Sequence, residues 1–309
     1  MTGDASTDPV RDAPPWRDVD LPGIGLIEVR DSGPATEAHD QPAILLLHGW
    51  TASADLNWCR TYGPLTSWFG GRTRLVAWDH RGHGARGLRT GTTTELDDLA
   101  DDAAAIARAL GIEQAVAVGY SMGGAVAQAL WRRHNDLVVG LVLGATAARF
   151  AVDDRQRRNF DMIGRGVGPS RLLEAMGCGR PAWRYARWLG DRRAPGSAST
   201  GDTAFDEWAW RETRAGVLSQ VLAAGRDLGR FDSTGWLDGV DVPHAVLVCE
   251  KDETVPTVRQ RELVAALPYP TIHEIAADHA ACVTRPELFI PALTKALESV
   301  LPSQLHKTR

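Results

Sequence analysis

The chain has 309 residues, of which 44% are hydrophobic and 24% are charged, and its formal net charge is −5. This composition is typical of a globular protein, and the slightly acidic balance gives no reason to expect nucleic acid or an anionic membrane as a partner. The longest apolar runs, such as residues 42–47, are far too short to span a bilayer.

The beginning of the chain and its cysteines indicate a cytoplasmic protein. Residues 1–19 are polar and acidic, and no basic segment followed by an apolar one occurs there. This pattern predicts a disordered lead-in rather than a secretory signal. Cys59, Cys178, Cys249 and Cys282 are widely scattered and form neither a disulfide framework nor a metal-binding spacing. We therefore expect a reducing compartment.

Strand-like and helix-like segments alternate along most of the chain. The expected strands are residues 25–29, 43–48, 73–79, 114–118, 138–144, 244–250 and 271–275. The expected helices are residues 58–69, 95–110, 122–133, 258–267 and 286–300. Thr94 is placed to cap the second helix, with Asp97 three residues further on. The alternation predicts an α/β fold with a mostly parallel sheet and helices on both faces.

The alternation stops between residues 147 and 241. This stretch is helical in tendency, rich in arginine and tryptophan, and has no run typical of a buried strand. We expect an inserted helical cap, or lid, over the carboxyl edge of the sheet, where α/β proteins bind their ligands. Residues 20–146 and 242–303 would then form the α/β core.

The segment Gly119-Tyr120-Ser121-Met122-Gly123 lies between an expected strand and an expected helix. Strand, G-x-S-x-G turn and helix together predict a nucleophile elbow. Gly119, Gly123 and Gly124 would let the strand and the helix approach without a Cβ clash, and Ser121 would need strained backbone angles. The serine would lie at a helix N-terminus, which favours a developing negative charge. A structural glycine-rich turn is the alternative.

A base and an acid are needed to activate such a serine. His279 follows the last expected strand, so it lies at the same sheet edge as the elbow; a solvent-facing loop histidine is the alternative. Asp252 follows the preceding strand and could accept a hydrogen bond from His279. Glu250 and Glu253 compete for that role but are expected at the surface. Serine, aspartate and histidine occur in the chain order of α/β-hydrolase triads.

An oxyanion intermediate needs two hydrogen-bond donors. The backbone N–H of Met122 follows the nucleophile and is the first candidate. The second is the backbone N–H of Trp50, in the loop His48-Gly49-Trp50 after an early strand. Gly49 would allow the chain to bend there, and His48 would hold the loop by hydrogen bonds rather than take part in catalysis.

The substrate pocket is assigned to four aromatic residues. Trp50 and Tyr120 flank the expected site, and Trp183 and Trp188 belong to the tryptophan-rich insertion, which favours an apolar or aromatic substrate. Residues 79–84 hold two histidines and an aspartate, but no second cluster accompanies them, so we expect a turn and no metal or cofactor.

Residues 48–50, 79–84 and 119–124, the Asp252 loop and His279 resemble the α/β-hydrolase fold family, in its lidded esterase/lipase-like branch. The resemblance covers about residues 25–300. It implies an eight-stranded, mostly parallel sheet with an antiparallel second strand and a cap after strand 6. It also implies a triad of Ser121, Asp252 and His279, with an oxyanion hole from Trp50 and Met122. The missing eighth strand is expected within residues 19–29.

The family leaves the substrate open. We expect a serine hydrolase that cleaves a small-to-medium, apolar carboxylic ester through an acyl-enzyme. One alternative is a carbon–carbon bond hydrolase of ring-cleavage products, in which arginines of the insertion hold substrate carboxylates: Arg180, Arg184, Arg187, Arg192 and Arg193. Others are a cofactor-free haloperoxidase or perhydrolase, a lactonase, and a ligand receptor on a hydrolase scaffold. The sequence does not indicate the oligomeric state.

Overall fold

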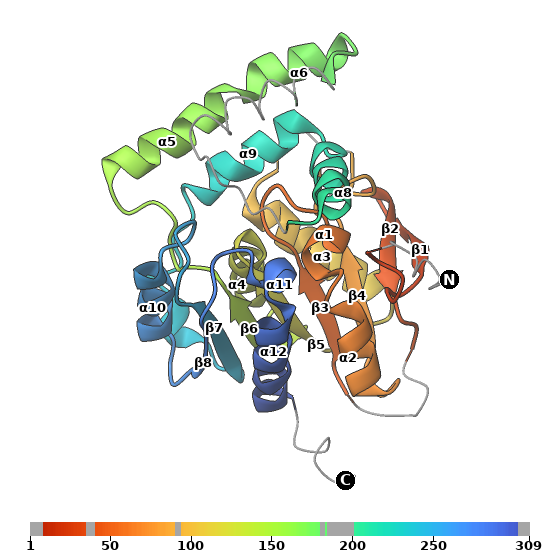
Figure 1. The fold of residues 1–309 in the computed structure, drawn as a ribbon, viewed down its shortest axis with the longest axis vertical. Helices are drawn as coiled ribbons and strands as arrows, with labels where there is room; N and C mark the ends of the chain where they lie inside the picture. Colours follow the sequence, from red (N-terminus) through yellow and green to blue (C-terminus); the bar gives the residue numbers. More distant parts are fainter. Residues whose placement is uncertain (1–8, 35–40, 90–93, 180–182, 184–200, 302–309) are drawn as a thin grey trace.

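A twisted eight-stranded sheet forms the centre of the molecule (Figure 1). The computed structural model describes residues 9–34, 41–89, 94–179, 183 and 201–301. The strands are β1 (Trp16–Leu21), β2 (Gly25–Asp31), β3 (Ala43–Leu47), β4 (Leu75–Trp78), β5 (Ala115–Tyr120), β6 (Val138–Gly144), β7 (His244–Cys249) and β8 (Thr271–Ile275). They lie in the order β1-β2-β4-β3-β5-β6-β7-β8. β2 is antiparallel to β1 and β4, and the pairs from β4 to β8 are parallel.

The first strand starts earlier than the sequence pattern indicated. Residues 16–19, which we expected in the disordered lead-in, form the first part of β1 and pair with β2. Val19 and Leu21 are buried, and the Arg30 guanidinium lies 4.4 Å from the ring centre of Trp16. These cross-strand contacts hold a segment whose composition alone is that of a flexible terminus.

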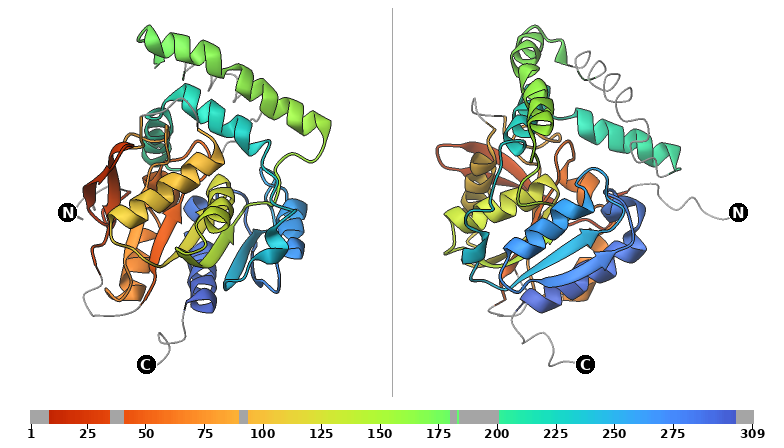
Figure 2. Two further views of the ribbon diagram at one scale, coloured as in Figure 1. Left: turned by 180° about the vertical axis from the view of Figure 1, so that it is seen from behind. Right: turned by 90° about the vertical axis from the view of Figure 1, so that its left-hand side faces the viewer.

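Helices cover both faces of the sheet (Figure 2). One face carries α1 (Ala54–Trp58), α2 (Tyr62–Phe69), α11 (Ala281–Thr284) and α12 (Pro286–Val300). The other carries α3 (Leu96–Ala109), α4 (Met122–Arg133) and α10 (Thr257–Ala266). Two apolar cores result, which explains why β3, β4, β5 and β7 are buried along their whole length.

Two local expectations need correction. The helix expected over residues 58–69 is two helices, α1 and α2. Ser53 caps α1, accepting from the N–H of Leu56 at 3.0 Å, and Pro64 has no N–H to continue a single helix. The N-cap of α3 is Glu95 rather than Thr94, and the N–H of Glu95 donates to Asp98 at 3.0 Å.

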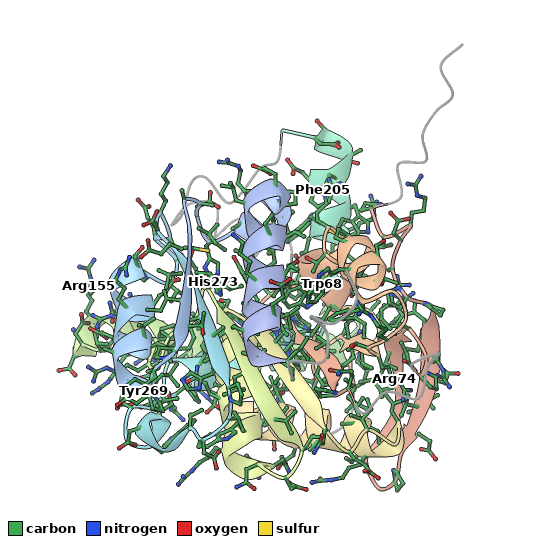
Figure 3. All side chains as sticks on the ribbon, turned by 90° about the horizontal axis from the view of Figure 1, so that it is seen from below. Trp68, Arg74, Arg155, Phe205, Tyr269 and His273 are labelled. Carbon is green, nitrogen blue, oxygen red and sulfur yellow. The ribbon has the colours of Figure 1, made fainter. Side chains whose placement is uncertain are left out.

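Among the residues that the structure describes between β6 and β7, four α-helices and a short 3-10 helix are present. They are α5 (Asp154–Arg165), α6 (Val167–Ala175), α8 (Thr203–Arg214), α9 (Leu218–Leu228) and η1 (Leu237–Gly239). α5 and α6 lie farthest from the sheet, and α9 runs between them and the core (Figures 1 and 2). The Arg60 guanidinium lies 5.0 Å from the ring centre of Phe205 in α8; Phe205 is labelled in Figure 3. Among the described residues, no helix has the length and apolar character needed to cross a membrane.

Candidate active site

Ser121 occupies a sharp turn between β5 and α4. Its backbone has φ of 55°, in the left-handed region that non-glycine residues rarely adopt. A Cβ on Gly119 would overlap the Gly123 carbonyl oxygen, and one on Gly123 would overlap the Leu47 carbonyl oxygen. A Cβ on Gly124 would overlap the side chain of Thr146. The strained serine and the close approach expected of a nucleophile elbow are both present.

A hydrogen-bonded chain joins Ser121, His279 and Asp252. The Ser121 Oγ lies 3.0 Å from His279 Nε2, and His279 Nδ1 lies 2.7 Å from Asp252 Oδ2. A carboxylate only accepts, so Nδ1 carries the proton and Nε2 is left to accept from the serine hydroxyl. The Asp252 side chain is fully buried, whereas the imidazole is 23% exposed. The arrangement can deprotonate the serine as it attacks and hold the resulting imidazolium.

Asp252 is fixed by donors on both oxygens. Its Oδ1 accepts from the N–H groups of Thr254 and Val255, each at 2.9 Å. Its Oδ2 also accepts from Gln260 Nε2 at 2.9 Å. The competing acids Glu250 and Glu253 are exposed, as expected.

The loop that carries His279 rests on Tyr120. The Tyr120 hydroxyl donates to the His279 carbonyl at 2.9 Å, and its ring packs edge-on against Trp58 and Phe289. The side chain is buried with the α12 layer, and burial raises the pKa of the phenol. Alternation along β5 turns Tyr120 toward these helices, where it supports the His279 loop. Its assignment to the substrate pocket stays a prediction.

The loop of residues 48–51 lies directly against the nucleophile. A Cβ on Gly49 would be 3.4 Å from the Ser121 Cβ. His48 holds this loop as expected: Nε2 accepts from the His80 N–H, and Nδ1 donates to the Gly49 carbonyl, each at 2.8 Å. Among the described residues, none accepts a hydrogen bond from the backbone N–H of Trp50 or Met122.

The other expected pocket residues are placed as follows. The Trp50 indole N–H donates to the Val221 carbonyl of α9 at 2.7 Å, so this ring contacts the inserted helices. Trp183 is buried and donates to the Gly216 carbonyl at 3.0 Å, in a small apolar cluster of the insertion. It therefore contributes to the insertion's own packing. Trp188 and the five arginines of residues 180–193 lie outside the described residues.

Residues 79–84 form a turn, within which the His83 N–H donates to the His80 carbonyl at 2.8 Å. Asp79 accepts from the N–H groups of Ala54 and Arg86, at 2.8 and 3.1 Å. Burial raises its pKa to about 6. Burial also lowers the pKa of His80 to about 3 and that of His83 to about 4. In the described part of the chain, no group of three or more His, Cys, Asp or Glu side chains is arranged to hold a metal ion.

Three supporting residues escaped sequence reasoning. Asn57 Oδ1 accepts from the Gly49 N–H at 3.0 Å, and Thr146 Oγ1 donates to the Ser121 carbonyl at 2.7 Å. Gln260 bridges Asp252 and the Cys249 N–H. A polar side chain inside an otherwise buried helix face was the only signal for Asn57 and Gln260.

The sheet order, the inserted helices and the strained serine are those of an α/β hydrolase. Residues 44–292 match the sequence profile of the Alpha/beta hydrolase family, and the chain belongs to this family.

Named relatives of the chain carry different activities. A protein of Agrobacterium fabrum named putative carbamate hydrolase RutD is 28% identical over 85% of this chain and 95% of its own length. The bifunctional esterase/perhydrolase DCH of Acinetobacter calcoaceticus is 30% identical over 74% of this chain and 79% of its own length. A thermophilic esterase from Thermogutta terrifontis shares the fold, with a TM-score of 0.67 and 23% identity over 93% of this chain and 99% of its own.

Proposed function

We propose that the protein is a serine hydrolase that cleaves small-to-medium carboxylic esters with apolar acyl or alcohol groups. The observation that carries the proposal is the chain of hydrogen bonds from Ser121 through His279 to Asp252. The backbone N–H groups of Trp50 and Met122, beside the serine, support it as the two oxyanion donors.

The reaction follows from these positions. As the Ser121 oxygen attacks the ester carbonyl, His279 Nε2 takes its proton, and the carbonyl oxygen becomes an oxyanion between the two N–H groups. His279 then gives the proton to the departing alkoxide, which leaves as an alcohol. Water attacks the acyl-enzyme with its proton passing to His279, which returns it to Ser121 as the acid departs.

The inserted helices are proposed to act as the cap of this site. They contact the core through Trp50, and the tryptophan-rich composition of the insertion favours an apolar substrate. The scattered cysteines support a cytoplasmic location. A small-molecule ester is the proposed partner, without nucleic acid, membrane or cofactor.

The proposal is tested by Ser121→Ala, assayed on p-nitrophenyl esters of increasing acyl length. Hydrolysis should fall about 10⁴-fold or more, because the nucleophile is lost and only binding and oxyanion stabilisation remain. Ser67→Ala, at an exposed position in α2, is the matched control and should keep parental activity. Equal turnover by Ser121→Ala and the parent would refute the assignment.

A carbamate is the second candidate substrate, because relatives named as putative carbamate hydrolases match most of the chain. Its carbonyl carbon would be attacked by the same serine. A panel of esters, carbamates, lactones and ring-cleavage diketones, with a peracid-formation assay, separates the alternatives by relative kcat/KM. A receptor role would be indicated if Ser121 resisted a fluorophosphonate probe while the protein bound a small apolar ligand tightly.

A further inference from the structure

The residue proposed to supply one oxyanion donor also contacts an inserted helix. Trp50 lies in the loop after β3, and its indole N–H donates to the Val221 carbonyl of α9 at 2.7 Å. Its ring packs with Trp183, Leu218 and Val221 of the insertion. One side chain thus joins the loop beside Ser121 to a helix about 170 residues away in sequence.

Gly225 makes this contact possible. It lies one turn after Val221 on α9, and a Cβ there would overlap the indole at Cζ2 and lie 2.7 Å from Cε2 and 3.1 Å from Nε1. The indole therefore packs against the helix backbone at Gly225, at a distance that only glycine allows. An alanine would have to push away either the helix or the ring.

The helix cannot easily move away, because the core holds it near both ends. At its start, the Val217 N–H donates to the Gly82 carbonyl at 2.7 Å. Toward its end, Asp227 accepts from the N–H of Leu96, the first residue of α3, at 2.7 Å. A new side chain at position 225 would therefore displace Trp50 rather than α9.

Displacing the Trp50 ring would also disturb its backbone. The neighbouring Gly49 is held by Asn57, and Thr51 has a strained φ of 61°. The loop between these residues is short, so a shift of the indole must be taken up at the peptide that carries the Trp50 N–H.

We propose that Gly225 is a positioning residue for the hydrolytic reaction: α9 sets the place of the oxyanion loop through the Trp50 indole. The inference rests on the proposed function. It couples the inserted helices to stabilisation of the transition state through the Trp50 N–H.

The test is Gly225→Ala, measured with a p-nitrophenyl ester and with a trifluoromethyl ketone that mimics the oxyanion. We expect kcat to fall about 10-fold or more, because small misplacements of a catalytic group cost this much or more, and KM to change little. The ketone Ki should weaken in parallel with kcat/KM, because both depend on the oxyanion donors. A general loss of folded protein would not reproduce this parallel.

Gly168→Ala is the matched control, because Gly168 lies in α6 of the same insertion with open space around it. It should leave kcat and Ki at parental values. A second test places Gly225→Ala in a Trp50→Phe background, where the smaller ring removes the overlap. The loss caused by the alanine should then be several-fold smaller than in the parent.

The outcomes separate the two hypotheses. If Ser121→Ala abolishes turnover but Gly225→Ala leaves kcat and Ki unchanged, the positioning role is wrong and the proposed function stands. If Gly225→Ala causes the same loss in the parent and in the Trp50→Phe background, the effect does not pass through the indole and the inference is overturned. If Ser121→Ala retains full turnover, the proposed function itself fails.

Discussion

At the scale of single residues, the site depends on buried polar groups that hold reacting groups in place. The two oxygens of Asp252 accept hydrogen bonds from four donors, one of which is His279 Nδ1. Because the carboxylate only accepts, this bond fixes the His279 tautomer with its proton on Nδ1. Asn57 supports the loop of residues 48–51, which carries the proposed oxyanion donor, in the same way. Its amide accepts from Gly49 N–H and donates to Cys282 Sγ at 3.6 Å, in the helix that follows the His279 loop.

Asn57→Leu should lower kcat about 10-fold with a smaller change in KM. The leucine keeps the volume but leaves the Gly49 N–H without an acceptor, which also costs about 1–3 kcal/mol in free energy of unfolding. Steady-state kinetics and urea unfolding of the same preparation measure both effects. Parental kcat together with parental stability would show that this hydrogen bond does not hold the loop.

At the scale of elements, the nucleophile elbow depends on the approach of β5, α4 and β3. Gly123 faces the backbone of Leu47 and His48, whereas Gly124 faces the side chain of Thr146. Backbone in the middle of a sheet has little freedom to move, whereas a side chain can change its rotamer. The two positions should therefore differ in their tolerance of a methyl group.

Gly123→Ala should prevent folding or lower the free energy of unfolding by about 3 kcal/mol or more, which is at the upper end for overpacking. Gly124→Ala should cost less, about 1–3 kcal/mol, and retain measurable turnover in the ester assay that tests the proposed function. Urea midpoints of the two variants and the parent give the comparison. Equal midpoints for the two variants would contradict this account of the elbow.

At the scale of the whole molecule, the buried histidines make stability depend on pH. The rings of His48, His80 and His83 lie together, with centres 4.3 to 6.5 Å apart, and burial lowers the pKa of each. Below pH 6.5 the unfolded chain takes up protons that these folded histidines do not. The free energy of unfolding therefore falls as the pH decreases from 6.5 toward about 4.

Asp79 acts in the opposite direction. Its pKa is raised to about 6 in the folded state, so the folded chain takes up this proton first and gains stability as the pH falls from 6 to 3.8. Between pH 6.5 and 5, His80 and His83 each contribute a loss of about 1.6 kcal/mol, against a gain of about 1.2 kcal/mol from Asp79. The free energy of unfolding therefore decreases overall between pH 6.5 and 5.

His80→Phe tests this balance. Among the described residues, neither ring nitrogen of His80 has a hydrogen-bond partner, so phenylalanine removes the titration without removing a side-chain hydrogen bond. The loss in free energy of unfolding between pH 6.5 and 5 should shrink by about 1.6 kcal/mol. Urea unfolding at the two pH values measures it, and an unchanged loss would show that His80 does not contribute to acid sensitivity.

The sequence by itself determined the α/β fold, the elbow and the three residues that meet beside it. Alternating apolar segments predict a parallel sheet. Because the carboxyl ends of parallel strands meet at one edge, placing Ser121, Asp252 and His279 after three such strands brings them close together. These features depend on local periodicity and on chain order, which a single sequence carries.

Tertiary structure decided the rest. The start of β1 at Trp16 and the support from Asn57 and Gln260 depend on partners in a neighbouring strand or loop of the folded chain. The inward turn of Tyr120 depends on the His279 loop, which is distant in the chain. The same holds for the contact of Trp50 with α9. No local pattern predicts them, because the free energy that selects each conformation comes from packing and hydrogen bonds between elements that meet only in the folded protein.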